Sequence, residues 1–248
     1  MKFGSGVLKN PKSFSKIAEI VPPGSVVVLS ALAGVTDQLI DLALEVHPSP
    51  PRRELDMLVS VGERISIALF AMALDRQGKV GVSFTGSQSG IITTSDHTEA
   101  RILDVRPTRL ISALSAEKVV IVAGFQGVSL EKEITTLGRG GSDTSAVALG
   151  VALNAEKVIF YKDVPGIFSH HPKDKGAKRM SALTYEEALT IVQRTGNVLH
   201  PRALQLAAQN GLPLHVRSLN EEGTEISTMM ERTKPQYEEP LSADCYAL

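Results

Sequence analysis

A glycine-rich segment around Arg139 carries the strongest sign of chemistry in this 248-residue sequence. It reads TTLGRGGSDTSAVAL from residue 135 to 149, and Ser142 can cap a helix that carries Asp143 in its first turn. Backbone N–H groups at the positive end of a helix dipole bind anions, and a guanidinium group matches a carboxylate or phosphate with two parallel hydrogen bonds. We therefore predict an anion site here, although a tight turn with an ordinary helix cap would give the same pattern.

The start of the chain could hold a phosphate group. A short strand is expected to end in Gly4, Ser5 and Gly6, which suit a small anion-binding nest of backbone amides. Lys2 is placed where a cation could meet a transferring phosphate. Alone the signal is weak, because glycines after a strand usually form a simple turn and a terminal lysine is usually solvated.

Two further segments could bind a small polar ligand. Residues 30–37 (SALAGVTD) follow an apolar run, and open α/β sheets bind ligands at the carboxyl ends of their strands. Residues 60–64 (SVGER) place a glycine inside a helical pattern; such a glycine costs about 1 kcal/mol relative to alanine, which indicates close approach of a ligand or of backbone. Glu63 could then receive a substrate ammonium. A helix cap and an exposed Glu63–Arg64 pair are the simpler alternatives.

A predicted strand runs into a turn at residues 161–168 (YKDVPGIF), and His170 and His171 follow it. Adjacent histidines can bind a metal ion, but this pair has no Cys, His or Asp partner at ligand spacing. We therefore predict no metal site built from protein side chains.

Short apolar runs alternate with longer amphipathic stretches, a pattern typical of layered α/β proteins with a mainly parallel sheet. The expected strands are residues 26–29, 80–84, 118–125, 157–161 and 214–216. The expected helices are residues 55–77, 142–153, 185–193 and 201–209, and one that begins at Asn10–Pro11 and places Phe14, Ile17, Ala18 and Val21 on one face.

Composition narrows the class of protein. The net charge of −1 has no basic surplus and does not suggest binding to nucleic acid. Cys245 is the only cysteine, so no disulfide can form within the chain. No uninterrupted apolar run reaches the roughly 20 residues that span a bilayer, and the first residues do not resemble a signal peptide. We expect a soluble, cytoplasmic protein without a membrane partner.

Seven motifs in order resemble the catalytic domain of aspartate kinases, members of the amino-acid kinase family. They are KFG at 2–4, SALAGVTD at 30–37, SVGER at 60–64, GIIT at 90–93, TTLGRGGSD at 135–143, DVPGIF at 163–168 and VLHPRAL at 198–204. The resemblance implies a three-layer α/β/α sandwich of the carbamate kinase-like type, with one kinase domain at residues 1–227. It implies transfer of a phosphoryl group from ATP, accompanied by Mg²⁺, to the side-chain carboxylate of L-aspartate. A homodimer is also implied.

The resemblance also implies roles for individual residues. Lys2 would stabilise charge on the transferring phosphoryl group, and Asp143 would organise the site. Arg139 would bind the substrate carboxylate, and Thr36 and Glu63 would hold the rest of the amino acid. The implied substrate site further includes Ser30, Gly140 and Ser142, and the implied nucleotide-binding residues are Lys162, Asp163, Phe168, Lys173 and Asn197.

Three departures from the family pattern stand out. Ser5, Gly6 and Val7 replace a glycine, a threonine and a serine, so two loop hydroxyls are lost. Asn197 stands where the family usually has a lysine near the ATP phosphates, and Lys162 stands where it usually has a threonine. Lys162 could therefore supply the charge that Asn197 lacks.

The sequence leaves alternatives for the role of the C-terminal region and for the exact activity. Aspartate kinases commonly carry regulatory ACT domains, and about 22 residues follow Ile226 here, so we expect no direct feedback inhibition by lysine or threonine. Residues 228–248 form a polar tail that we expect to be loosely held. Two alternatives remain: another amino acid or small carboxylate is the acceptor, or the chain is an inactive binding subunit that pairs with an active kinase.

Overall fold

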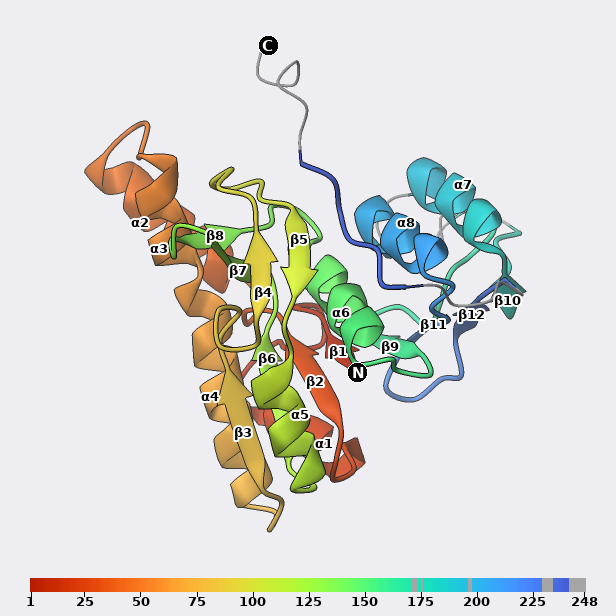
Figure 1. The fold of residues 1–248 in the computed structure, drawn as a ribbon. Helices are drawn as coiled ribbons and strands as arrows, with labels where there is room; N and C mark the ends of the chain where they lie inside the picture. The colour runs from red at the N-terminus through yellow and green to blue at the C-terminus, as the bar shows by residue number, and fades with distance from the viewer. Residues whose placement is uncertain (171–173, 175, 196–197, 229–233, 241–248) are drawn as a thin grey trace.

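A large, mainly parallel sheet forms the centre of the protein (Figure 1). The structure, a computed structural model, describes the chain except residues 171–173, 175, 196–197, 229–233 and 241–248. The strand order is β10-β12-β11-β9-β1-β2-β6-β3, and every neighbouring pair is parallel except β11 and β12. The strands are β1 (Lys2–Phe3), β2 (Val26–Leu29), β3 (Gly81–Phe84), β6 (Val119–Ala123), β9 (Val158–Tyr161), β10 (Ala182–Leu183), β11 (Leu214–Arg217) and β12 (Thr224–Ile226).

The valine-rich runs form strands because both of their faces are covered. Val27 and Leu29 of β2 belong to one apolar cluster, whereas Val28, between them, belongs to the other. All five strands expected from the sequence are present, as β2, β3, β6, β9 and β11. The sequence prediction of a buried parallel sheet is therefore confirmed.

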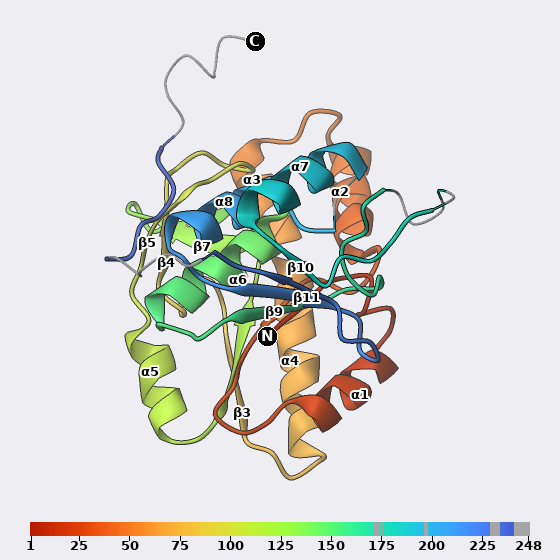
Figure 2. The same cartoon turned by 90° about the vertical axis from the view of Figure 1, so that its right-hand side faces the viewer.

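Helices cover both faces of this sheet. On one face, α1 (Lys12–Ile20) and α4 (Val61–Asp75) pack together. The other face carries α5 (Thr108–Ser115), α6 (Gly141–Ala152), α7 (Tyr185–Thr195) and α8 (Pro201–Gln209). Figure 2 shows α4 and α5 on opposite sides of β3. This arrangement is the three-layer α/β/α sandwich that the family resemblance implies.

The helix expected at residues 55–77 is two helices, α3 (Arg52–Val59) and α4, which meet at Ser60. A Cβ on Gly62 would lie 2.9 Å from the Cβ of Ala31, so the expected close approach comes from the protein itself. By length and composition alone, residues 52–75 could cross a membrane. In this fold Phe70 and Leu74 are buried against the sheet, as in the core helix of an α/β protein.

A second, smaller sheet and two helices were not expected from the sequence. The sheet has the order β5-β4-β7-β8 and lies near α2 and α3 in Figure 1. Its strands are β4 (Ile91–Thr93), β5 (Ile102–Val105), β7 (Gln126–Ser129) and β8 (Ile134–Thr136). The additional helices are α2 (Val35–Val46) and α5. These strands are three or four residues long, too short to give a clear alternation of apolar and polar residues.

The described part of the C-terminal tail is bound to the body of the protein. Asn210 Nδ2 donates to the carbonyl of Gln236 at 2.9 Å, and the amide of Glu238 donates to the carbonyl of Ile102 at 2.9 Å. The Glu238 carboxylate accepts from Nε of Arg202 at 2.7 Å. Sequence analysis expected a loosely held end, whereas these contacts attach residues 236–238 to α8 and β5.

Candidate active site

A cavity of about 790 Å³ opens at the carboxyl edge of the large sheet. Strands β1, β2 and β9 are neighbours, and the residues that follow them line the cavity. These residues are Gly4, Ser5 and Gly6 after β1, Ser30 and Ala31 after β2, and Lys162 and Asp163 after β9. Parallel strands bring their carboxyl ends to one edge, which explains why segments far apart in sequence meet here.

A buried carboxylate with two lysines lies in this cavity. Lys2 Nζ is 2.5 Å from Oδ1 of Asp143, and Lys162 Nζ is 2.8 Å from Oδ2. Asp143 is in the first turn of α6, as the sequence predicts, while the lysines come from β1 and from the end of β9. Two ammonium groups and one carboxylate leave a net positive charge, which favours an anionic ligand.

Burial and charge shift the pKa values of this cluster in opposite directions. Burial would raise the pKa of Asp143, but the charges of Lys2 and Lys162 outweigh it and hold that pKa well below its usual range. Burial lowers the pKa of Lys2 to about 8, against the raising effect of Asp143. Asp143 is therefore ionised at neutral pH, and Lys2 loses its proton more readily than an exposed lysine.

The glycine-rich loop wraps the amino end of α6. Gly140 has a φ of 70°, and a Cβ there would lie 2.1 Å from Cγ of His200, so no other residue fits this place without displacing the imidazole. Gly140 rather than Ser142 is the helix cap, and no side-chain hydrogen bond caps α6. The predicted capping role of Ser142 is thus wrong; this residue follows the first helical residue and faces the cavity.

Glu63 is a buried carboxylate in the same cavity. Its Oε1 accepts a hydrogen bond from the amide of Ala31 at 3.1 Å, and its Oε2 has no partner among the described residues. Burial raises the pKa of Glu63 to about 7, although the Ala31 amide and the charge of Lys2 act to lower it. A buried oxygen without a partner is costly, so a cationic or hydrogen-bonding ligand would be stabilised here.

The turn at residues 4–6 presents backbone to the cavity. Gly4 accepts hydrogen bonds from the amides of Val7 and Leu8 at 3.0 and 3.1 Å, which closes the turn. A Cβ on Gly6 would lie 2.8 Å from Cγ of Asp163, so this loop packs directly against the Asp163 carboxylate. The anion-binding nest expected at residues 4–6 stays a prediction.

Most residues predicted from the sequence come together in this cavity. The lining includes Lys2, Gly4, Ser5, Gly6, Ser30, Thr36, Glu63, Arg139, Gly140, Ser142, Asp143, Lys162 and Asp163. Phe168 lies outside it and forms an isolated bridge with Arg179. Lys173 and Asn197 lie outside the described residues, so their predicted roles stay predictions.

Several lining residues were missed by sequence reasoning. Thr98, Phe125, Thr136 and His200 all face the cavity. His200 could have been suspected from the VLHPRAL motif, whereas Thr98 gives no signal in the sequence because its position depends on a loop between two short strands. Among the described residues, no group of three or more His, Cys, Asp or Glu side chains could hold a metal ion.

The fold and this cavity define a member of the amino acid kinase family, and the family matches the sequence over residues 1–218. The chain belongs to this family. Among solved structures, a uridylate kinase of Bacillus anthracis shares the fold at 20% identity, with a TM-score of 0.63 over 92% of this chain and 95% of that one.

Within the family, the chain is similar to aspartokinases. It is 47% identical to the aspartokinase of Mycobacterium bovis, over 88% of this chain and 53% of that protein, and 44% identical to that of Corynebacterium glutamicum, over 93% and 57%. The aspartate kinase structure from Synechocystis matches at 40% identity with a TM-score of 0.80, over 93% of this chain and 40% of that one. Escherichia coli aspartokinase III in complex with aspartate and ADP matches at 26% identity with a TM-score of 0.82, over 93% and 64%. The chain spans about half the length of the curated relatives it matches.

Proposed function

We propose that this protein transfers the γ-phosphoryl group of ATP to the side-chain carboxylate of L-aspartate and forms 4-phospho-L-aspartate. The observation that carries the proposal is the content of one cavity: the Lys2–Asp143–Lys162 cluster suits phosphate, and Glu63 and Arg139 suit the two charged groups of an amino acid. The aspartokinase relatives, one of them solved with aspartate and ADP, support aspartate as the acceptor.

The proposed binding of the acceptor follows from charge. Glu63, with its unpartnered Oε2, would receive the ammonium group, and Arg139 would hold the α-carboxylate through its planar fork. Thr36, Ser30, Gly140 and Ser142 line the same space and would complete the substrate site. The side-chain carboxylate would then point toward Lys2 and Asp143.

The proposed reaction needs alignment and positive charge more than proton transfer. A carboxylate oxygen of aspartate attacks the γ-phosphorus, the bond from that phosphorus to the bridging oxygen breaks, and ADP leaves. The acceptor is already ionised at neutral pH, so no general base is required. Lys2 and Lys162 would stabilise the charge on the equatorial oxygens, Asp143 would hold both ammonium groups in place, and the turn at residues 4–6 would contact the phosphates.

The nucleotide side of the proposal rests on fewer contacts. Asp163 and Lys162 face the cavity, while Phe168, Lys173 and Asn197 are assigned to ATP by resemblance. Mg²⁺ would bind together with the nucleotide, because this hard cation is held mainly by phosphate oxygens and water and needs few protein ligands.

We further propose a cytoplasmic homodimer that catalyses the first step toward lysine, threonine and methionine. Val61, Ile65, Ala68 and Met72 form an exposed apolar stripe along α4, at the 4-3-4 spacing typical of helices that pack on one another. A second copy of the chain is the partner that we propose for this stripe.

An ATP- and Mg²⁺-dependent hydroxamate assay tests the activity, with aspartate beside a panel of other amino acids. Aspartyl hydroxamate should form, and Lys2→Ala or Asp143→Ala should abolish it. Activity with another acceptor alone would keep the mechanism and replace the substrate. Folded protein that binds ATP or aspartate without turnover would overturn the proposal and favour a binding subunit.

A further inference from the structure

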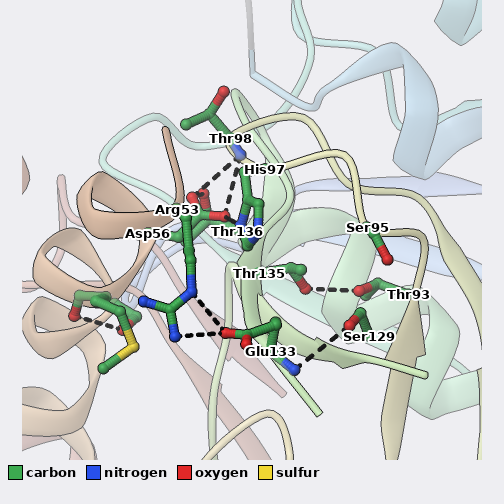
Figure 3. A network of polar contacts seen from close by, with 12 residues as sticks. Arg53, Asp56, Thr93, Ser95, His97, Thr98, Ser129, Glu133, Thr135 and Thr136 are labelled. Atoms are coloured by element: carbon green, nitrogen blue, oxygen red, sulfur yellow. Dashed lines mark hydrogen bonds and ion pairs between the residues drawn. The ribbon is translucent and has the colours of Figure 1, made fainter. Parts of the chain in front are cut away.

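Asp56 of α3 lies beside the cavity and is completely buried. A buried carboxylate is stable only when its oxygens are well paired. Its Oδ2 is 2.8 Å from Nδ1 of His97, and its Oδ1 accepts from Oγ1 of Thr136 at 2.5 Å. Both oxygens lie 3.1 Å from the amide of Thr98 (Figure 3). Carboxylate oxygens accept hydrogen bonds, so the tautomer of His97 that carries hydrogen on Nδ1 would donate to Asp56.

These contacts join three segments that are far apart in the chain. Asp56 belongs to α3, Thr136 ends β8, and His97 and Thr98 lie in the loop between β4 and β5. The same loop is also bound to β8 by the amide of Ala100, which donates to the carbonyl of Thr136 at 2.9 Å. The Asp56 carboxylate is therefore the point at which this loop, helix α3 and strand β8 meet.

The loop is held in an unusual conformation where it reaches the cavity. Thr98 has a φ of 74°, which is costly for a β-branched residue and persists only when its surroundings enforce it. The two bonds from its amide to Asp56 provide that restraint. Thr98 and Thr136 both line the cavity, so the restraint acts on its wall.

The same contacts also restrain the loop that contains Arg139. A Cβ on Gly138 would lie 3.0 Å from the carbonyl oxygen of Thr98, so the Thr98 backbone packs directly on the residue before Arg139. Strand β8 ends at Thr136, two residues before Gly138. The segment that leads into Arg139 is thus held at Thr136 by Asp56 and contacted at Gly138 by the Thr98 backbone.

We propose that Asp56 and His97 are positioning residues for the acceptor side of the cavity: they hold Thr98 and the Arg139 loop in the geometry that binds the carboxylate of the amino-acid substrate. The inference rests on the proposed kinase function. Neither residue needs to touch the substrate. The nucleotide side of the cavity, formed by the residues after β9, lies outside this network.

Two substitutions of His97 separate positioning from general stability. His97→Phe keeps the ring but removes the donor, while the amide of His97→Asn can donate from nearly the same place as Nδ1. For His97→Phe we expect the KM for aspartate to rise about 10- to 100-fold, while the KM for ATP stays within about twofold. In His97→Asn the KM for aspartate should return most of the way to the wild-type value. Equal changes in both KM values, or an unchanged KM for aspartate in folded His97→Phe, would overturn the inference. If His97→Phe does not fold, His97→Gln replaces it as the variant without the donor. The amide of this glutamine takes the place of Nε2, so it does not restore the hydrogen bond that Nδ1 makes with Asp56.

A matched control is available on the same two elements. Nη2 of Arg53, on α3, is 2.8 Å from Oε2 of Glu133, which lies next to β8 (Figure 3). Both side chains of this ion pair are exposed, Arg53 at 47% and Glu133 at 39%. Arg53→Ala should leave both KM values unchanged, because exposed ion pairs contribute little. A rise in the KM for aspartate as large as that of His97→Phe would show that any loosening of α3 has the effect, and would refute a specific role for His97.

Hydrogen exchange tests the inference without turnover. His97→Phe should accelerate exchange of backbone amides at residues 97–100 and 136–141 and leave residues 158–163 unchanged. This outcome would support the positioning role even if the hydroxamate assay showed another acceptor. Unchanged exchange in both first segments would refute it, whatever the enzymatic activity.

Discussion

Lys162 Nζ lies 2.8 Å from Oδ2 of Asp143, on the same carboxylate whose Oδ1 binds Lys2. The departures from the family pattern suggested that Lys162 could supply the charge that Asn197 lacks. Asn197 is outside the described residues, but the position of Lys162 beside Asp143 fits that hypothesis. A second ammonium group at this place would act on the transferring phosphoryl group directly.

Removal of the Lys162 charge should slow the reaction. Lys162→Met keeps most of the side-chain volume, and we expect kcat to fall about 100-fold, as for other groups that stabilise charge in the transition state. Steady-state kinetics with aspartate and MgATP would measure this. Lys157→Met is the control, since Lys157 is exposed and its ion pair with Glu225 is long, at 3.9 Å between Nζ and Oε1. The kcat of this variant should not change. Unchanged ATP affinity and turnover in Lys162→Met would refute the role.

The activity should depend on pH through Glu63 and Lys2. Burial raises the pKa of Glu63 to about 7, so the carboxylate takes up a proton below that pH and can no longer pair with a substrate ammonium. Burial lowers the pKa of Lys2 to about 8, so its positive charge is lost above that pH. We expect kcat/KM for aspartate to fall on both sides of pH 7 to 8.

Glu63→Gln is the matched variant for this profile. It should reduce kcat/KM above pH 7, where the wild-type Glu63 is ionised, and remove the decline on the acid side, while the decline on the alkaline side stays. The measurement is kcat/KM from pH 5.5 to 9.5 in buffers of constant ionic strength. An unchanged acid decline in the variant would assign that decline to another group.

Gly140 should tolerate no side chain. A Cβ there would lie 2.1 Å from the imidazole of His200, and φ is 70°. We expect Gly140→Ala to lower the free energy of unfolding by about 1–3 kcal/mol more than Gly78→Ala, because overpacking adds to the cost of the backbone conformation. Gly78 has a φ of 72° with nothing within 4 Å of an added Cβ. Urea unfolding of both variants gives the comparison, and equal losses would mean that His200 moves aside freely.

The apolar stripe of α4 should control the oligomeric state. Ile65 is 41% exposed within the stripe, and Ile111 is 51% exposed on α5, on the opposite face of the sheet. Ile65→Glu should convert a dimer to monomers in sedimentation velocity, whereas Ile111→Glu should not. A dimer that survives Ile65→Glu, or a wild-type monomer, would contradict this interface.

The large sheet and most of the cavity residues could be predicted from the sequence because their signals are local. The valine run at residues 26–29 and the glycines around Arg139 determine strand and loop with little help from distant residues. His97 and Thr98 were missed for the opposite reason: their places depend on hydrogen bonds to Asp56, which is 41 and 42 residues away in the sequence. The break at Ser60 was also missed, since residues 55–77 carry an uninterrupted helical pattern.

The central place of β1 determines when the cavity can form during folding. Lys2 and Phe3 pair with Val28 and Leu29 on one side and with Phe160 and Tyr161 on the other. Lys2 and Lys162 therefore meet only after a loop of about 160 residues has closed, a contact of high sequence separation that is entropically costly and slow to form. A chain in which β9 has not yet reached β1 has no paired lysines at Asp143, so this cluster requires that both ends of the long loop are in place.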